Sequence, residues 1–202
     1  KVLVMKIFLF FLIFILSVQS WSNADDIRDF EMEGISVGDN LLDHYNTLGV
    51  TKKFIENKKL TYYPKSKEFA LTAYKNRGNY KTYYKLQFTI DPTNYEIYKV
   101  GGFLEISGKN DCVAKQKKII KDLIETDASL TKFVDDFSKH PIDDTGESIS
   151  NGVYLDFPSG DSIDVECYLW GDKLKTEGYE DNLRVDENIT NLINKHIKNE
   201  IT

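Results

Sequence analysis

One predicted helix carries one of only two cysteines in this 202-residue chain. The stretch 110–126, NDCVAKQKKIIKDLIET, begins with the N-capping residue Asn110 and continues with an apolar stripe that includes Cys112. The other cysteine, Cys167, lies on the apolar side of a predicted strand. Two cysteines in an exported chain most often form one bridge. We therefore predict a Cys112–Cys167 disulfide that ties a central helix to a β-hairpin.

The first 24 residues have the features of a signal peptide. Lys6 precedes an apolar run at 7–18, which is shorter than the ~20 residues of a membrane span. Ser22 and Ala24 then supply the small residues that precede a cut after Ala24. An uncleaved anchor is the alternative. Cleavage predicts a periplasmic or secreted protein with a single domain at 25–202.

The net charge of the chain limits the kinds of partner that such a protein would bind. The formal net charge is −6, which disfavours nucleic acid and anionic membrane surfaces. We expect no nucleic-acid partner, no membrane contact after cleavage, and no cofactor. The expected partner is another protein or a small ligand of the cell envelope, bound by a monomer.

Alternation of apolar and polar residues predicts five strands. Segments 68–74, 81–91 and 97–106 would form an antiparallel meander, and 153–157 and 163–169 a C-terminal hairpin. Capping residues and helical spacing predict a helix that ends at Gly49, further helices at 51–57, 110–126 and 130–137, and a last helix that begins at Asp186. A loop is expected at 171–184. This order predicts an α+β fold with one antiparallel sheet of about five strands and helices packed on one face. The other face, with polar residues such as Lys85, Asp164 and Glu166, should be exposed to solvent.

Three segments carry a resemblance to known proteins. They are 26–44, DIRDFEMEGISVGDNLLDH; 140–150, HPIDDTGESIS; and 161–170, DSIDVECYLW. Together they resemble a group of small exported proteins predicted from marine alphaproteobacterial genomes. The resemblance implies a bacterial, exported protein and assigns a role to no residue.

The polar loop at 139–151 holds the residue types of a hydrolase. Ser148 would be the nucleophile, His140 the base, and Asp143 or Asp144 the orienting acid. The chain has no nucleophile elbow, and triads are usually assembled from distant segments, so we do not assign a catalytic site.

The same loop holds candidate cation ligands. Asp143, Asp144 and Glu147 are hard oxygen donors suited to calcium, although their spacing does not match an EF-hand. An acidic, solvated loop is the simpler interpretation, so we predict no metal site. A nucleophilic Cys112 with His140 as base is also conceivable, but it competes with the predicted disulfide.

Aromatic residues provide the last candidate surface. Tyr83, Tyr168 and Trp170 could form a platform for a glycan or an apolar ligand, although aromatic residues are common in strands for packing reasons. We favour an exported binding or interaction protein over an enzyme. The alternatives are a small hydrolase that uses the His140–Ser148 loop and an inhibitor-like or structural accessory protein of the envelope.

Overall fold

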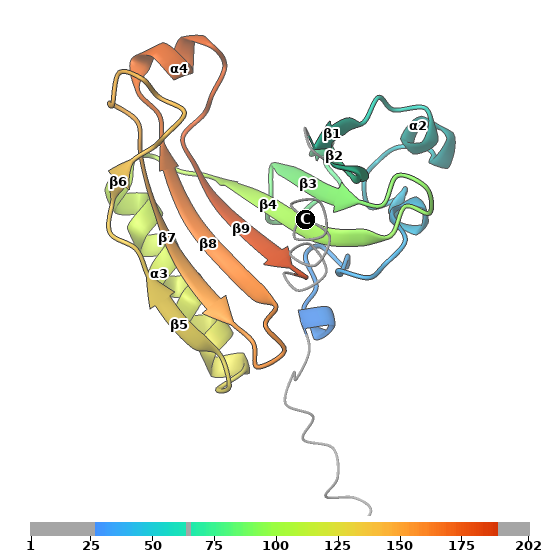
Figure 1. Ribbon diagram of the computed structural model, residues 1–202, viewed down its shortest axis with the longest axis horizontal. Helices are drawn as coiled ribbons and strands as arrows, with labels where there is room; N and C mark the ends of the chain where they lie inside the picture. The colour runs from blue at the N-terminus through green and yellow to red at the C-terminus, as the bar shows by residue number, and fades with distance from the viewer. Residues whose placement is uncertain (1–26, 64–65, 190–202) are drawn as a thin grey trace, which may run out of the picture.

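The computed structural model describes residues 27–63 and 66–189 (Figure 1). The predicted signal peptide at 1–24 and the predicted helix beyond residue 189 lie outside these residues. Within them, nine strands form one antiparallel sheet in the order β1-β2-β3-β4-β9-β8-β7-β5, with β6 also paired to β7. The strands are β1 (Thr61–Tyr63), β2 (Ser66–Lys75), β3 (Lys85–Ile90), β4 (Ile97–Glu105), β5 (Thr131–Val134), β6 (Ser138–Lys139), β7 (Ile149–Asp156), β8 (Ser162–Leu169) and β9 (Asn182–Asn188).

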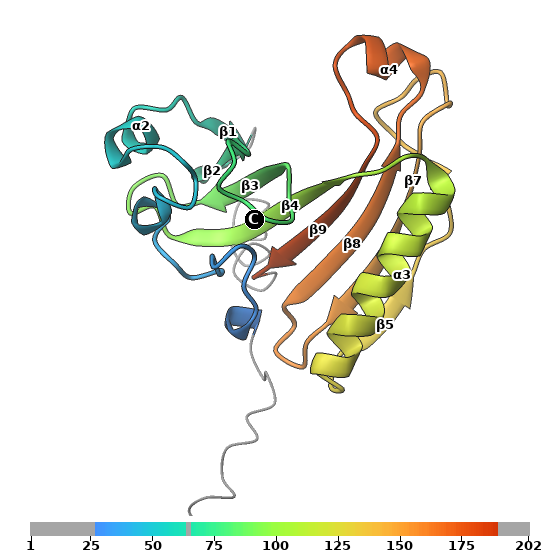
Figure 2. The same cartoon turned by 180° about the vertical axis from the view of Figure 1, so that it is seen from behind.

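One long helix covers one face of the C-terminal half of this sheet. The helix is α3 (Lys109–Thr126), which contacts β8 and β9 and is seen in front of the C-terminal strands in Figure 2. Cys112 on α3 is bonded to Cys167 on β8, and their Cα atoms are 6.0 Å apart. Gln116, which interrupts the apolar stripe, is buried and donates a hydrogen bond to the Val165 carbonyl at 2.8 Å. The predicted disulfide is thus confirmed, and it points to an oxidising compartment.

The N-terminal segment covers the same face of the other half. It contains short helices at Ile27–Asp29, Leu41–His44 and α2 (Lys52–Glu56), and it lies beside β3 and β4 in Figure 1. Its side chains join those of β3 and β4 in one core. Gly102 allows this close approach, because a Cβ there would lie 2.6 Å from the sulfur of Met32. The remaining helix, α4 (Asp172–Thr176), lies between β8 and β9.

The α+β class and the helix-covered face are confirmed, but the sheet is larger than predicted. The segment 130–137 was predicted to be helical, yet its residues 131–134 form the edge strand β5. The helix expected from Asp186 is also wrong for the described residues, which continue strand β9. The expected loop at 171–184 contains α4 and the start of β9. Both helix predictions failed because strand pairing, of β5 with β7 and of β9 with β4 and β8, outweighs the local pattern.

Candidate functional site

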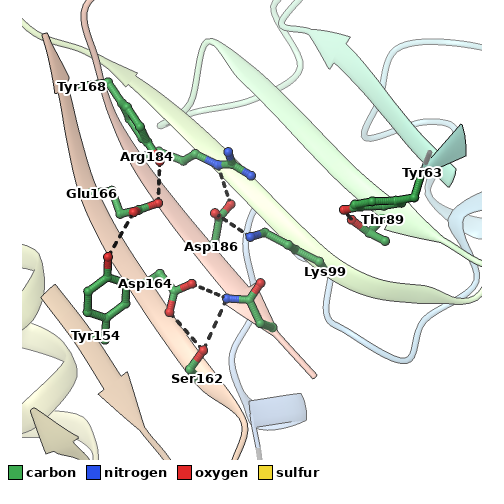
Figure 3. A network of polar contacts seen from close by, with 11 residues as sticks. Tyr63, Thr89, Lys99, Tyr154, Ser162, Asp164, Glu166, Tyr168, Arg184 and Asp186 are labelled. Carbon is green, nitrogen blue, oxygen red and sulfur yellow. Dashed lines mark hydrogen bonds and ion pairs between the residues drawn. The ribbon is translucent and has the colours of Figure 1, made fainter. Parts of the chain in front are cut away.

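A cluster of charged side chains lies on the sheet face opposite α3. Asp186 on β9 is only 1% exposed, and it accepts two charged hydrogen bonds. One comes from Lys99 Nζ at 2.8 Å and the other from Arg184 Nε at 2.8 Å (Figure 3). We call Lys99, Arg184 and Asp186 the Asp186 cluster.

Strand register explains how this cluster forms. Asp186 is paired with Gly101 of β4, so Lys99 two residues earlier points to the same face. A Cβ on Gly101 would clash with the Asp186 carboxylate, so glycine leaves the space that this carboxylate occupies. Arg184 is paired with Phe103, and its guanidinium lies 5.2 Å from the centre of that ring.

The surroundings set the charge state of the cluster. Burial lowers the pKa of Arg184, but the Asp186 carboxylate outweighs that effect and the net pKa is raised. Burial raises the pKa of nearby Asp164 to about 6, although the charge of Lys99 opposes this rise. The cluster thus places two basic side chains on one buried carboxyl group, an arrangement that carries a desolvation cost.

A pocket of about 270 Å³ opens beside the two cations. Its polar wall includes Lys99, Arg184, Gln87, Thr89 and Tyr63. The Tyr63 hydroxyl lies 3.3 Å from the Thr89 hydroxyl. Figure 3 shows these two side chains next to each other. Within residues 27–63 and 66–189, the terminal Nη atoms of Arg184 have no hydrogen-bond partner. Because one hydroxyl of the Tyr63–Thr89 pair donates to the other, the pocket presents one remaining O–H donor, the Arg184 Nη donors and positive charge, which suits an anionic group.

An acidic row adjoins the cluster on β8. Glu166 accepts hydrogen bonds from Tyr168 at 2.7 Å and from Tyr154 at 3.4 Å. Asp164 accepts one from Asn188 at 2.7 Å. Burial and the Glu166 charge raise the pKa of Tyr168, so its hydroxyl stays protonated and donates. These carboxylates are therefore satisfied within the sheet, and the donors of the pocket remain for a ligand.

The predicted hydrolase residues do not assemble as a triad. Ser148 is 0% exposed, and its hydroxyl donates to Asp143 at 2.5 Å and accepts from the Gly171 N–H at 2.8 Å. His140 Nδ1 instead accepts from the Ile142 N–H at 3.3 Å. Hydrogen bonds from Ser148 and Thr145 hold the pKa of Asp143 well below its usual range. These contacts give Asp143 and Ser148 the role of fixing the loop.

The candidate calcium ligands do not converge either. Asp143 is turned inward to its own loop, and Asp144 pairs with Lys173 at 2.6 Å. In the part of the chain that is described, no three His, Cys, Asp or Glu side chains gather as a metal-binding group, and Glu147 therefore belongs to none.

The predicted aromatic platform is divided between the two faces. Tyr168 and Trp170 are stacked, with centroids 5.5 Å apart and planes 10° apart. His140 and Tyr179 pack against Trp170 at 4.8 and 4.9 Å, so its ring is largely occupied. Tyr83 lies on the other face, where its ring approaches Gly102. The three residues therefore do not form one surface.

Sequence reasoning missed the Asp186 cluster because β9 was not recognised as a strand. The alternation of Leu183 and Val185 with Arg184 and Asp186 was the signal that could have identified it.

Comparison with family models, with curated proteins and with solved structures finds no match for this chain. Among residues 27–63 and 66–189, no helix is long and apolar enough to span a membrane.

Proposed function

We propose that this protein is an exported binding protein that holds a small acidic ligand on the sheet face opposite α3. The anionic group of the ligand would lie against Lys99 and Arg184, with the hydroxyls of Tyr63 and Thr89 beside it. The observation that carries the proposal is the pair of cations fixed on buried Asp186 at 2.8 Å, with unused donors facing a pocket of about 270 Å³.

Binding explains these features better than catalysis does. Asp186 is paired with two cations at 2.8 Å, so it would orient them as a fixed support. The buried Ser148 and the ring of His140 have separate partners, which gives the hydrolase alternative no support. The disulfide and the predicted signal peptide support export.

The overall charge limits what the ligand can be. Because the chain carries a formal charge of −6, long-range forces repel anions, and attraction begins only near the two cations. This favours a small ligand with one localised anionic group over an extended polyanion.

Titration calorimetry at low ionic strength would test the proposal. The probes are sulfate, succinate and glucuronate, with glucose as the uncharged reference. We expect at least one anion to bind and glucose not to bind. Lys99→Gln should weaken that binding by roughly tenfold, because it removes one charged contact. Lys173→Gln is the matched control, since Lys173 lies at α4 and pairs with Asp144. Absence of binding to all three anions at millimolar concentration would refute the proposal, as would equal binding by Lys99→Gln with an unchanged fold.

A further inference from the structure

A second surface, separate from the Asp186 cluster, lies between α3 and the sheet edge at β5. It is a groove of about 550 Å³. One wall consists of Val113, Ile120 and Ile124 of α3, and the other includes Val134 and Val153. Most of the groove is therefore apolar, and it lies on the face that α3 covers.

Among the described residues, the strand beside the groove has one edge without a partner strand. In the described residues β5 pairs only with β7, and all four of its residues are exposed. Phe133 is 56% and Val134 59% exposed, which is unusual for large apolar side chains. The Asp135 N–H donates to Gly152 of β7, so the N–H groups of Lys132 and Val134 point the other way, to the outer edge.

Charge indicates what would occupy this edge. Lys117, Lys121 and Lys132 line the groove, whereas its only acidic lining residue, Glu125, pairs with Lys121 at 3.4 Å. The rim is thus positive on a chain whose formal net charge is −6. A second copy joined through β5 would bring these lysines together, so charge disfavours self-association.

We propose that the β5 edge and its groove bind an extended acidic segment of a partner protein. The segment adds as a strand along β5 and accepts and donates backbone hydrogen bonds at Lys132 and Val134. Its alternate apolar side chains enter the groove between α3 and Val134, and its carboxylates meet the lysines of the rim. The short length of β5 and the charges of Asp135 and Asp136 at its end limit pairing to a few residues, as at protected edges.

The test begins with selection of a random twelve-residue peptide library on the full chain. The expected peptides alternate apolar with acidic residues. Hydrogen exchange should show new protection of the Lys132 and Val134 amides when such a peptide is bound. Recovery of no peptide, of peptides without acidic residues, or of protection confined to other strands would overturn the proposal.

Charge reversal provides the matched variants. Lys117→Glu combined with Lys132→Glu should weaken the selected peptide by roughly tenfold or more, because two attractive contacts become repulsive. Lys118→Glu, exposed on the same helix outside the groove, should change affinity by less than about twofold. Equal loss in both variants would overturn the assignment to the groove. Sedimentation that shows a dimer lost on the double reversal would assign the edge to a second copy and also overturn it.

Discussion

At the scale of single residues, Asp186 is the group on which the polar face depends. Its carboxylate is almost completely buried, and it balances Lys99 and Arg184 through bonds of 2.8 Å. The attraction within a buried ion pair is largely offset by the free-energy cost of removing both charges from water. Removal of one partner, however, leaves the other charge buried and uncompensated. Loss of Asp186 should therefore affect the folded state much more than loss of a surface carboxylate.

Replacement of Asp186 by alanine tests this role. Asp186→Ala should lower the free energy of unfolding by about 2–3 kcal/mol, since two partly buried cations lose their counter-charge. Urea denaturation followed by circular dichroism measures the change. Asp144→Ala, which removes an exposed pair with Lys173, should cost about 0–1 kcal/mol. Equal costs for the two variants would show that the cluster is not a buried network.

Glu187 provides a second prediction, on the opposite face. It is buried with one carboxylate oxygen unpaired among the described residues, and burial, with the charges of Asp186 and Glu31, raises its pKa to about 8. The unfolded chain releases this proton near pH 4.5, so stability falls as pH rises from there to about 8. Glu187→Gln should remove that loss and stabilise the protein at pH 8 by on the order of 2 kcal/mol. At pH 4 the two proteins should be equally stable by urea denaturation; a penalty at pH 8 would contradict the assignment.

At the scale of elements, the sequence predicted those whose pattern matches their contacts. The helix at 110–126 and the hairpin of β7 and β8 have one apolar face each, and each packs that face inward. Strand β9 differs because it is buried on both faces and yet contains polar residues. Those polar residues led to the prediction of a loop there. The polar site could not be predicted, since its members come from β3, β4 and β9 and meet only when those strands pair.

The disulfide between α3 and β8 yields the prediction that belongs to this scale. It closes a loop with a sequence separation of 55. Cys112→Ala combined with Cys167→Ala should lower the free energy of unfolding by about 2–4 kcal/mol, mainly because the unfolded chain gains freedom. The far-ultraviolet spectrum should be unchanged, because Gln116 and the apolar stripe still hold α3 to the sheet. Loss of helix signal in the folded variant would show that the bond, rather than packing, positions α3.

At the scale of the whole molecule, the two faces of the sheet differ in what covers them. The 27–57 segment and α3 cover adjacent halves of the same face and complete the core there. The polar residues of the central strands are left on the other face, where β4 and β9 bring the Asp186 cluster together. The pocket on this polar face therefore lies in the electrostatic field of all the charges of an acidic molecule. Ligand affinity should change when the charge of a nearby group changes.

Sulfate binding should therefore strengthen as the pH falls from 8 to 5. Sulfate stays a dianion over this range, whereas Asp164 takes up a proton near pH 6 because burial raises its pKa. Protonation removes one negative charge from the surroundings of Lys99 and Asp186.

Replacement of Asp164 by asparagine separates this effect from the titration of the rest of the molecule. Asp164→Asn should bind sulfate at pH 8 about as tightly as the wild type does at pH 5, and its affinity should vary much less with pH. Glu187, whose pKa burial raises to about 8, is present in both proteins, so any pH dependence that it causes survives the substitution. Calorimetry at constant ionic strength measures both affinities. A wild-type affinity that falls on acidification, or an Asp164→Asn protein with the full wild-type pH dependence, would show that Asp164 does not control the charge at the pocket.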